Sequence, residues 1–258
     1  MVYFVGAGPG AKDLITVRGL ELIKSADIVI YAGSLVNPEL LSNCREDCKI
    51  YNSAFMTLKE VIETMEEAEH KQLMTVRLHT GDPCLYGAIR EQIDMLKERK
   101  ILYEICPGVS SFCGAAAALS AEYTLPGISQ SVIITRMEGR TPVPEKESIE
   151  AFAAHQATMV IFLSAGMLLE LQQRLLAGGY PEDTKAAIVY KATWPEEKVC
   201  FCKLKELAKT AEEENIKKTA LIVIGEVLGD VYEYSRLYDE CFTTEYRKGR
   251  MLDENQPD

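Results

Sequence analysis

Short apolar runs alternate with amphipathic segments along the chain, and this alternation predicts repeated strand–helix units. In the first half, the apolar runs predict strands at 2–5, 28–31, 74–79 and 102–106. The amphipathic segments between and after them predict helices near 17–25, 57–70, 86–99 and 110–121. Apolar strands that alternate with helices are typical of a mostly parallel sheet with both faces covered.

A second series of the same kind follows a turn near residues 123–127. Its predicted strands are 131–136, 159–163, 186–191, 198–202 and 220–225. Its predicted helices are 145–154, 166–177 and 203–214. We therefore predict an α/β protein of two α/β domains, residues 1–113 and 126–246, and a polar, disordered tail over 247–258.

The first strand runs directly into Gly6-Ala7-Gly8-Pro9-Gly10, a loop that lets backbone approach a ligand closely. The loop matches the dinucleotide pattern G-x-G-x-x-A literally, but its context differs. Pro9 and Gly10 interrupt the expected helix start, which falls instead at Thr16. The second strand also lacks an acid at its end. We interpret the loop as a ligand-approaching turn of another kind, with a ligand-free tight turn as the alternative.

The other predicted strands also end in small loops that contain glycine, serine or proline. These loops are Ala32-Gly33-Ser34, Thr80-Gly81-Asp82-Pro83, Pro107-Gly108-Val109-Ser110-Ser111, Ser164-Ala165-Gly166 and Ala192-Thr193-Trp194-Pro195. In parallel α/β sheets, ligands bind at the carboxyl ends of strands, so these loops are the candidate site. From the residues alone, Asp82 is equally well interpreted as a helix-start cap or as a ligand contact.

Composition narrows the class of protein. At 258 residues and 47% hydrophobic composition the chain can bury a large core, and no apolar run reaches the length of a membrane span. The first strand begins at residue 2 without a cleavable leader, so we expect a cytoplasmic protein. The net charge of −11 disfavours a nucleic-acid partner. The 8 cysteines and 3 histidines lack the spacing of a metal site, so we expect no metal and free, structural thiols.

Several motifs, taken together and in order, resemble those of the tetrapyrrole (corrin-pathway) methyltransferases. The motifs are GAGPG at 6–10, YAGSLVNPELL at 31–41, RLHTGDPCLYG at 77–87, PGVSS at 107–111, FLSAGM at 162–167, YKATWPEEKV at 190–199 and TALIVIGEV at 219–227. The resemblance covers about the whole chain. It implies two α/β domains with a cofactor cleft between them, a homodimer, and methyl transfer from S-adenosyl-L-methionine, which leaves S-adenosyl-L-homocysteine.

Within this family, YAGSLVNPELL resembles the branch that methylates precorrin-4 at C11. The resemblance leaves the cobalt-containing and the metal-free substrate open. The free thiols favour cobalt-precorrin-4, because they are typical of an anaerobic life and the oxygen-independent route inserts cobalt early. Uroporphyrinogen III methylation is the alternative, although that branch carries a Gly-Gly-Asp-Pro loop and position 80 is threonine here. Diphthine synthases and ribosomal-RNA methyltransferases are more distant. A nucleotide-binding module without chemistry is the alternative from another class.

The resemblance also implies roles for individual residues. The cofactor contacts that it implies are Pro9, Thr80, Gly81, Asp82, Leu85, Ser110, Ser111, Ser164, Ala192 and Ala220. Gly8 and Gly10 would line the tetrapyrrole side of the first loop. Asp82 is the candidate catalytic residue, either by orienting the cofactor, which we prefer, or by accepting the proton that the methylated ring loses. Ala11-Lys12 replace the acid and proline of many relatives, so these two positions receive no role.

A tetrapyrrole of this pathway carries many carboxylates, whereas the protein is itself acidic. Binding therefore requires a local concentration of cations, and arginine pairs best with carboxylates. We hypothesise that at least one of Arg77 and Arg136 binds a substrate carboxylate. His79, in an apolar strand, is interpreted as a satisfied core histidine rather than a base. Trp194 and Tyr86 could face the macrocycle, but we prefer core packing for both.

Overall fold

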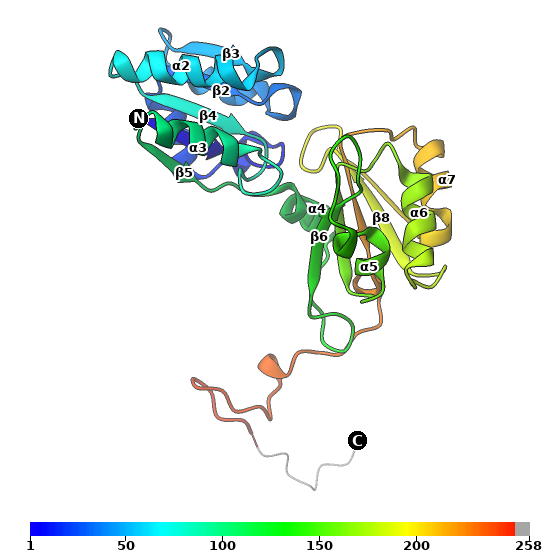
Figure 1. Ribbon diagram of the computed structural model, residues 1–258. Helices are drawn as coiled ribbons and strands as arrows, with labels where there is room; N and C mark the ends of the chain where they lie inside the picture. Colours follow the sequence, from blue (N-terminus) through cyan, green and yellow to red (C-terminus); the bar gives the residue numbers. More distant parts are fainter. Residues whose placement is uncertain (251–258) are drawn as a thin grey trace, which may run out of the picture. The chain divides into compact units, whose positions relative to one another are not determined.

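The computed structural model describes residues 1–250 and divides by internal contacts into two compact units, each described by itself below (Figure 1). The first unit comprises residues 1–120 together with 188–200 and 218–221. The second comprises residues 121–187, 201–217 and, within the described residues, 222–250. The boundaries predicted at 113 and 126 flank the division after residue 120, whereas the sequence pattern did not indicate the two later segments of the first unit.

The first sheet has five strands in the order β3-β2-β4-β1-β5. They are β1 (Val2–Gly6), β2 (Ile28–Tyr31), β3 (Lys49–Asn52), β4 (Thr75–His79) and β5 (Tyr103–Cys106). Its neighbouring strands are parallel, with Gly6 opposite His79 and Val5 opposite Cys106. This register places the carboxyl ends of β4, β1 and β5 side by side, so the loops that follow them start at one edge of the sheet.

Helices cover both faces of this sheet. They are α1 (Val17–Ser25), α2 (Leu58–His70), α3 (Ile89–Glu98) and α4 (Ser111–Leu119). Residues of α2 and α3 form one core with alternate residues of β1 and β2, among them Phe4 and Ile30. The opposite face forms a second core in which Ile23 of α1 packs with Val5 and Leu78. The helix starts follow local chemistry: Thr16 caps α1, and Thr57 with Glu60 forms a capping box on α2.

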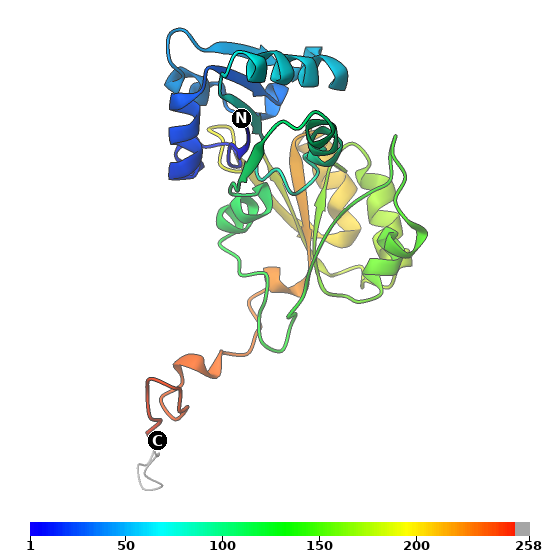
Figure 2. The same cartoon turned by 60° about the vertical axis from the view of Figure 1, so that its left-hand side comes forward.

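The second sheet has the order β6-β7-β10-β8-β9. Its strands are β6 (Val132–Arg136), β7 (Thr158–Phe162), β8 (Lys185–Tyr190), β9 (Lys198–Lys203) and β10 (Ala220–Ile224). β6 and β7 are parallel, whereas β10 runs antiparallel to β7, so this sheet is mixed. Its helices are α5 (Ile149–Ala153), α6 (Leu168–Ala177) and α7 (Leu207–Glu213). α5 packs beside α6, and α6 beside α7 (Figures 1 and 2).

The structure confirms the predicted α/β class and the nine predicted strands, but it adds β3, which the sequence analysis missed. β3 pairs with β2 alone and reads Lys-Ile-Tyr-Asn, with half-exposed and exposed side chains, so it has no apolar run. The helix predicted from 86 begins only at Ile89, because Tyr86 and Ala88 adopt positive φ angles of 57° and 49°. Residues 251–258 of the predicted disordered tail lie outside the described residues.

Candidate functional site

Three glycines from three loops meet at the carboxyl edge of the first sheet. Gly6 ends β1, Gly81 follows β4 and Gly108 follows β5. A Cβ atom on Gly6 would lie 2.5 Å from the Cα of Gly108 and 2.6 Å from the carbonyl oxygen of Gly81. A Cβ on Gly108 would lie 2.7 Å from the Cα of Gly6 and would overlap the carbonyl oxygen of Gly81. The loops therefore touch backbone to backbone, which only glycine permits. We call these residues the glycine junction.

Hydrogen bonds tie the first two loops together beside the glycine junction. The Gly81 amide donates to the carbonyl of Gly8 at 2.8 Å, and the Gly8 amide donates to the carbonyl of Gly81 at 3.3 Å. Both residues adopt left-handed backbone, with φ of 80° for Gly8 and 59° for Gly81. The loop 6–10 is therefore held as a short bridge against the loop that carries Asp82.

The Asp82 carboxylate joins the second loop to the third. One oxygen, Oδ1, accepts from the Cys84 amide at 2.7 Å, and Oδ2 accepts from the Gly108 amide at 2.8 Å. Burial raises the pKa of Asp82, but the hydrogen bonds from Cys84 and Gly108 outweigh it, so the pKa lies below its ordinary value. Asp82 is thus an ionised acceptor of two backbone N–H groups. This environment suits a residue that orients loops, and it suits a residue that accepts a proton less well.

Side chains from outside the first sheet form hydrogen bonds with the backbone of the loop 6–10 and of Ala11. The Asn37 side chain donates from Nδ2 to the carbonyl of Gly10 at 2.9 Å, and Trp194 donates from Nε1 to the carbonyl of Pro9 at 3.1 Å. Thr193 accepts at Oγ1 from the amide of Ala11 at 3.0 Å. The sequence pattern predicts no role for Asn37 and favours core packing for Trp194. The Asn37-Pro38 pair is a recognisable cap before a helical turn, but nothing in the sequence indicates its contact with Gly10.

A buried cation lies on β4. Arg77 is only 7% exposed and donates from Nε to Gln92 at 3.1 Å and from Nη1 to the Ile30 carbonyl at 3.0 Å. Burial lowers its pKa to about 10, so it stays charged at neutral pH. Within residues 1–250, no carboxylate forms an ion pair with it. A buried charge without an opposite partner is costly, and such a site suits an anionic ligand.

His79 lies two residues further along the same face of β4. It is 4% exposed, and its Nε2 atom is buried without a hydrogen-bond partner in the described part of the chain. Burial, assisted by the charge of Arg77, lowers its pKa to about 3, so the ring is neutral at physiological pH. Its ring centroid lies 6.1 Å from that of Phe4. The predicted core position is confirmed, but the expectation of a satisfied histidine is wrong, because Nε2 has no partner within residues 1–250.

The other predicted cofactor contacts in the first unit occupy loops or element ends. Thr80 and Leu85 flank Asp82, and Leu85 donates its amide to the Asp82 carbonyl at 3.3 Å. Ser110 is buried at the start of α4, and its hydroxyl does not cap the helix; Ser111 is the first residue of α4. Two more of the predicted cofactor-binding residues pack within the first unit. They are Ala192, which follows β8, and Ala220, which begins β10.

Two predicted site residues belong to the second unit. Ser164 is fully buried; its hydroxyl donates to the Phe162 carbonyl at 2.7 Å and accepts from the Met137 amide at 2.9 Å, so the side chain already has both partners. Arg136 donates to the carbonyls of the chain that follows it, including Met137 and Pro142, each at 3.0 Å. Its guanidinium is therefore held at the end of β6.

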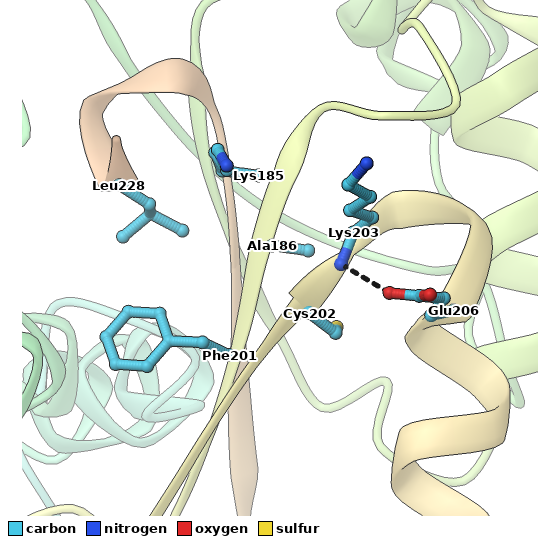
Figure 3. A pocket seen from close by; sticks show the side chains of 7 residues that line it. All are labelled: Lys185, Ala186, Phe201, Cys202, Lys203, Glu206 and Leu228. Atoms are coloured by element: carbon cyan, nitrogen blue, oxygen red, sulfur yellow. Dashed lines mark hydrogen bonds between the residues drawn. The ribbon is translucent and has the colours of Figure 1, made fainter. Parts of the chain in front are cut away.

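A separate hollow of about 340 Å³ lies in the second unit between β8, β9 and Leu228 (Figure 3). Phe201 and Leu228 form one side of it, and the Lys203 amide donates to the Glu206 carboxylate on the other. The Lys203 ammonium pairs with Asp183 at 3.0 Å. No predicted site residue lines this hollow, so the glycine junction remains the candidate site.

Residues 1–250 contain no set of three or more His, Cys, Asp or Glu side chains arranged to hold a metal ion. None of the helices in that part of the chain has the length and apolarity that crossing a membrane requires. All eight cysteines are free thiols.

Comparison with known proteins gives consistent matches over most of the chain. The sequence model of the family described as tetrapyrrole (corrin/porphyrin) methylases matches residues 1–208. A cobalt-precorrin-4 C(11)-methyltransferase of Methanocaldococcus jannaschii is 53% identical over 248 residues, which are 96% of each chain.

Solved structures agree with this match. The X-ray structure of a cobalamin biosynthetic enzyme, a cobalt precorrin-4 methyltransferase, has a TM-score of 0.87 and 44% identity, covering 89% of this chain and 96% of that one. A uroporphyrin-III C-methyltransferase from Thermus thermophilus, complexed with S-adenosyl homocysteine, has a TM-score of 0.74 and 25% identity, covering 88% and 92%.

We expect the glycine junction to tolerate no side chain. Gly108→Ala should lower the free energy of unfolding by roughly 1–3 kcal/mol, because its Cβ meets backbone on two sides. Gly139→Ala is the control, since a Cβ there meets nothing within 4 Å, and it should change stability by less than about 0.5 kcal/mol. Urea unfolding measures both variants, and equal midpoints would contradict the packing described above.

We expect His79 to make the protein sensitive to acid. Its pKa is about 3 in the folded chain, against about 6.5 when exposed, so its contribution to stability is complete above pH 6.5 and falls as the pH drops toward 3. The loss should approach about 1.4 kcal/mol per pH unit. Unfolding free energies at pH 7 and pH 5 should show a smaller decrease for His79→Gln than for the wild type. The exposed His70→Gln should behave like the wild type.

Proposed function

We propose, because the chain belongs to the family of tetrapyrrole (corrin/porphyrin) methylases, that it transfers a methyl group from S-adenosyl-L-methionine to C11 of cobalt-precorrin-4. The observation that carries this proposal is the 53% identity, across 96% of both chains, with a cobalt-precorrin-4 C(11)-methyltransferase. The product would be cobalt-precorrin-5A, an intermediate of cobalamin biosynthesis. We further propose that the protein works in the cytoplasm as a homodimer.

The glycine junction supports a role in cofactor binding. Three loops meet backbone to backbone there, and the buried Ser110 immediately precedes the helix after the third loop. Loops held this closely keep the residues after the glycines in fixed positions, from which their amides and carbonyls can contact a ligand. When bound, S-adenosylmethionine supplies a methyl group on a positively charged sulfur. We propose that the residues in contact with it are Pro9, Thr80, Gly81, Asp82, Leu85, Ser110, Ser111, Ala192 and Ala220. Ser164 would contribute through its backbone, because its hydroxyl is already engaged.

The chain's own residues would act through position. Methyl transfer from sulfur to carbon is an in-line displacement whose leaving group requires no protonation, so orientation and exclusion of water lower the barrier. Asp82 fits this scheme as the group that fixes the spacing of two loops, since both of its oxygens accept backbone N–H groups. Its lowered pKa makes it a weak proton acceptor, which supports orientation over the alternative of catalysis as a base.

Arg77 supports the binding of a polycarboxylate. The chain carries a net charge of −11, yet this arginine is buried, charged and not neutralised by a carboxylate of the described chain. A substrate carboxylate would supply the missing charge. Arg136 is the second candidate, in the second unit, and Gly8 and Gly10 would line the tetrapyrrole side of the first loop.

We expect label from methyl-labelled S-adenosylmethionine to enter a precorrin-4 substrate. The protein would be incubated anaerobically with cobalt-precorrin-4, metal-free precorrin-4 and uroporphyrinogen III in parallel, and the label in each macrocycle measured. Fastest incorporation into cobalt-precorrin-4 supports the proposal. Faster incorporation into metal-free precorrin-4 would reassign the metal state, and label in uroporphyrinogen III alone would reassign the substrate.

We expect at least one of Arg77→Met and Arg136→Met to weaken binding of cobalt-precorrin-4 by tenfold or more. Arg77→Met should leave the free energy of unfolding unchanged or raise it, because methionine removes an uncompensated buried charge. Arg90→Met is the control, since Arg90 is exposed and paired with Asp94 on α3. Dissociation constants measured anaerobically test this, and unchanged affinity in both Arg77→Met and Arg136→Met would refute the assignment.

A further inference from the structure

Two successive carbonyl groups of the loop 6–10 are each held by one side chain. The Gly10 carbonyl accepts from Nδ2 of Asn37 at 2.9 Å, and the Pro9 carbonyl accepts from Nε1 of Trp194 at 3.1 Å. Glycine has the greatest backbone freedom of any residue, and Gly8 and Gly10 flank Pro9. A loop of this composition keeps one conformation only when contacts from outside select it.

Asn37 is suited to this contact by both ends of its amide. It is 9% exposed and precedes the 3-10 helix Pro38–Asn43. Its Oδ1 accepts from the Glu39 amide at 2.9 Å, which caps this helix, while Nδ2 reaches Gly10. Aspartate would keep the acceptor and lose the donor, and serine would keep a cap but be too short to reach Gly10. The position therefore requires an amide for reasons beyond capping.

Trp194 contacts the same loop from a distant segment of the chain. A Cβ on Gly10 would overlap the indole, so the ring lies directly against this glycine. The neighbouring Thr193 accepts from the Ala11 amide, and the Lys191 ammonium lies 5.7 Å from the indole centroid. The indole and the Asn37 amide thus fix adjacent peptide groups by separate contacts.

We propose that Asn37 is a positioning residue for the tetrapyrrole substrate, acting through the Gly10 carbonyl, and that Trp194 acts through Pro9 on the cofactor. This inference rests on the proposed function, in which Gly10 faces the tetrapyrrole and Pro9 the S-adenosylmethionine. It also gives the segment 31–41 a physical connection to the site, because Asn37 lies within it. Loss of either contact frees one peptide group, and a misplacement of about 1 Å in a group that positions a reactant can lower the rate about a hundredfold.

The test compares Asn37→Ser and Asn37→Asp with a matched control, Asn43→Ser. Asn43 belongs to the same 3-10 helix and donates from Nδ2 to the Leu40 carbonyl at 3.1 Å, so its substitution removes a similar hydrogen bond away from the loop. We would measure KM for cobalt-precorrin-4, the dissociation constant of S-adenosylhomocysteine by calorimetry, and hydrogen exchange of the amides in residues 8–12.

Both Asn37 variants should raise KM at least fivefold and change the S-adenosylhomocysteine dissociation constant less than twofold. Their amides at residues 8–12 should exchange faster, whereas Asn43→Ser should match the wild type in all three measurements. Trp194→Phe, which retains a ring and removes the N–H donor, should show the opposite division: at least threefold weaker S-adenosylhomocysteine binding and a smaller change in KM.

The outcomes separate the two proposals. Methyl transfer by the wild type, with unchanged KM or unchanged exchange in both Asn37 variants, would overturn the positioning role alone. An equal loss of substrate and cofactor affinity in those variants would overturn the division of roles between Asn37 and Trp194. Absence of methyl transfer to either form of precorrin-4 by the wild type would overturn the proposed function and this inference with it.

Discussion

The approach of three backbones at Gly6, Gly81 and Gly108 is the constraint on which the candidate site depends. It follows from the parallel register, which starts the loops after β1, β4 and β5 at one edge of the sheet. The loops then come so close that a single methyl group at Gly6 or Gly108 would displace backbone. Asp82 completes this arrangement by accepting the Gly108 amide, so the spacing of the loops depends on glycines and one carboxylate together.

The buried cation on β4 contrasts with the negative net charge of the whole chain. The protein is acidic, yet β4 buries an arginine that pairs with no carboxylate of residues 1–250 and, beside it, a histidine that stays neutral. Such burial costs stability in the free protein, and a stable fold retains it more readily where a ligand compensates the charge. The proposed polycarboxylate substrate would do so. On this view β4 combines two requirements, a close-packed strand and an anion receptor.

Much of the fold could be predicted because its strands are apolar runs and its helices carry local caps, as at Thr16 and Thr57. β3 could not be predicted, because this edge strand has no apolar run. The loops of the site could be found from glycine and proline, but their partners could not. The contact between Asn37 and Gly10 spans 27 residues and that between Trp194 and Pro9 spans 185, and such pairings leave no local pattern. Motif resemblance supplied candidate roles; the geometry supplied which side chains hold the loops.

The division of the chain has a consequence for its synthesis. Residues 188–200 pack with a unit whose main part ends at residue 120, and they bring the indole that lies against Gly10. A ribosome that has made the whole first sheet has therefore not yet made everything that its first loop requires. The loop 6–10 therefore lacks its contact with Trp194 until most of the chain has been translated. Any fragment that stops after the first sheet contains the glycine loops but not their finished geometry.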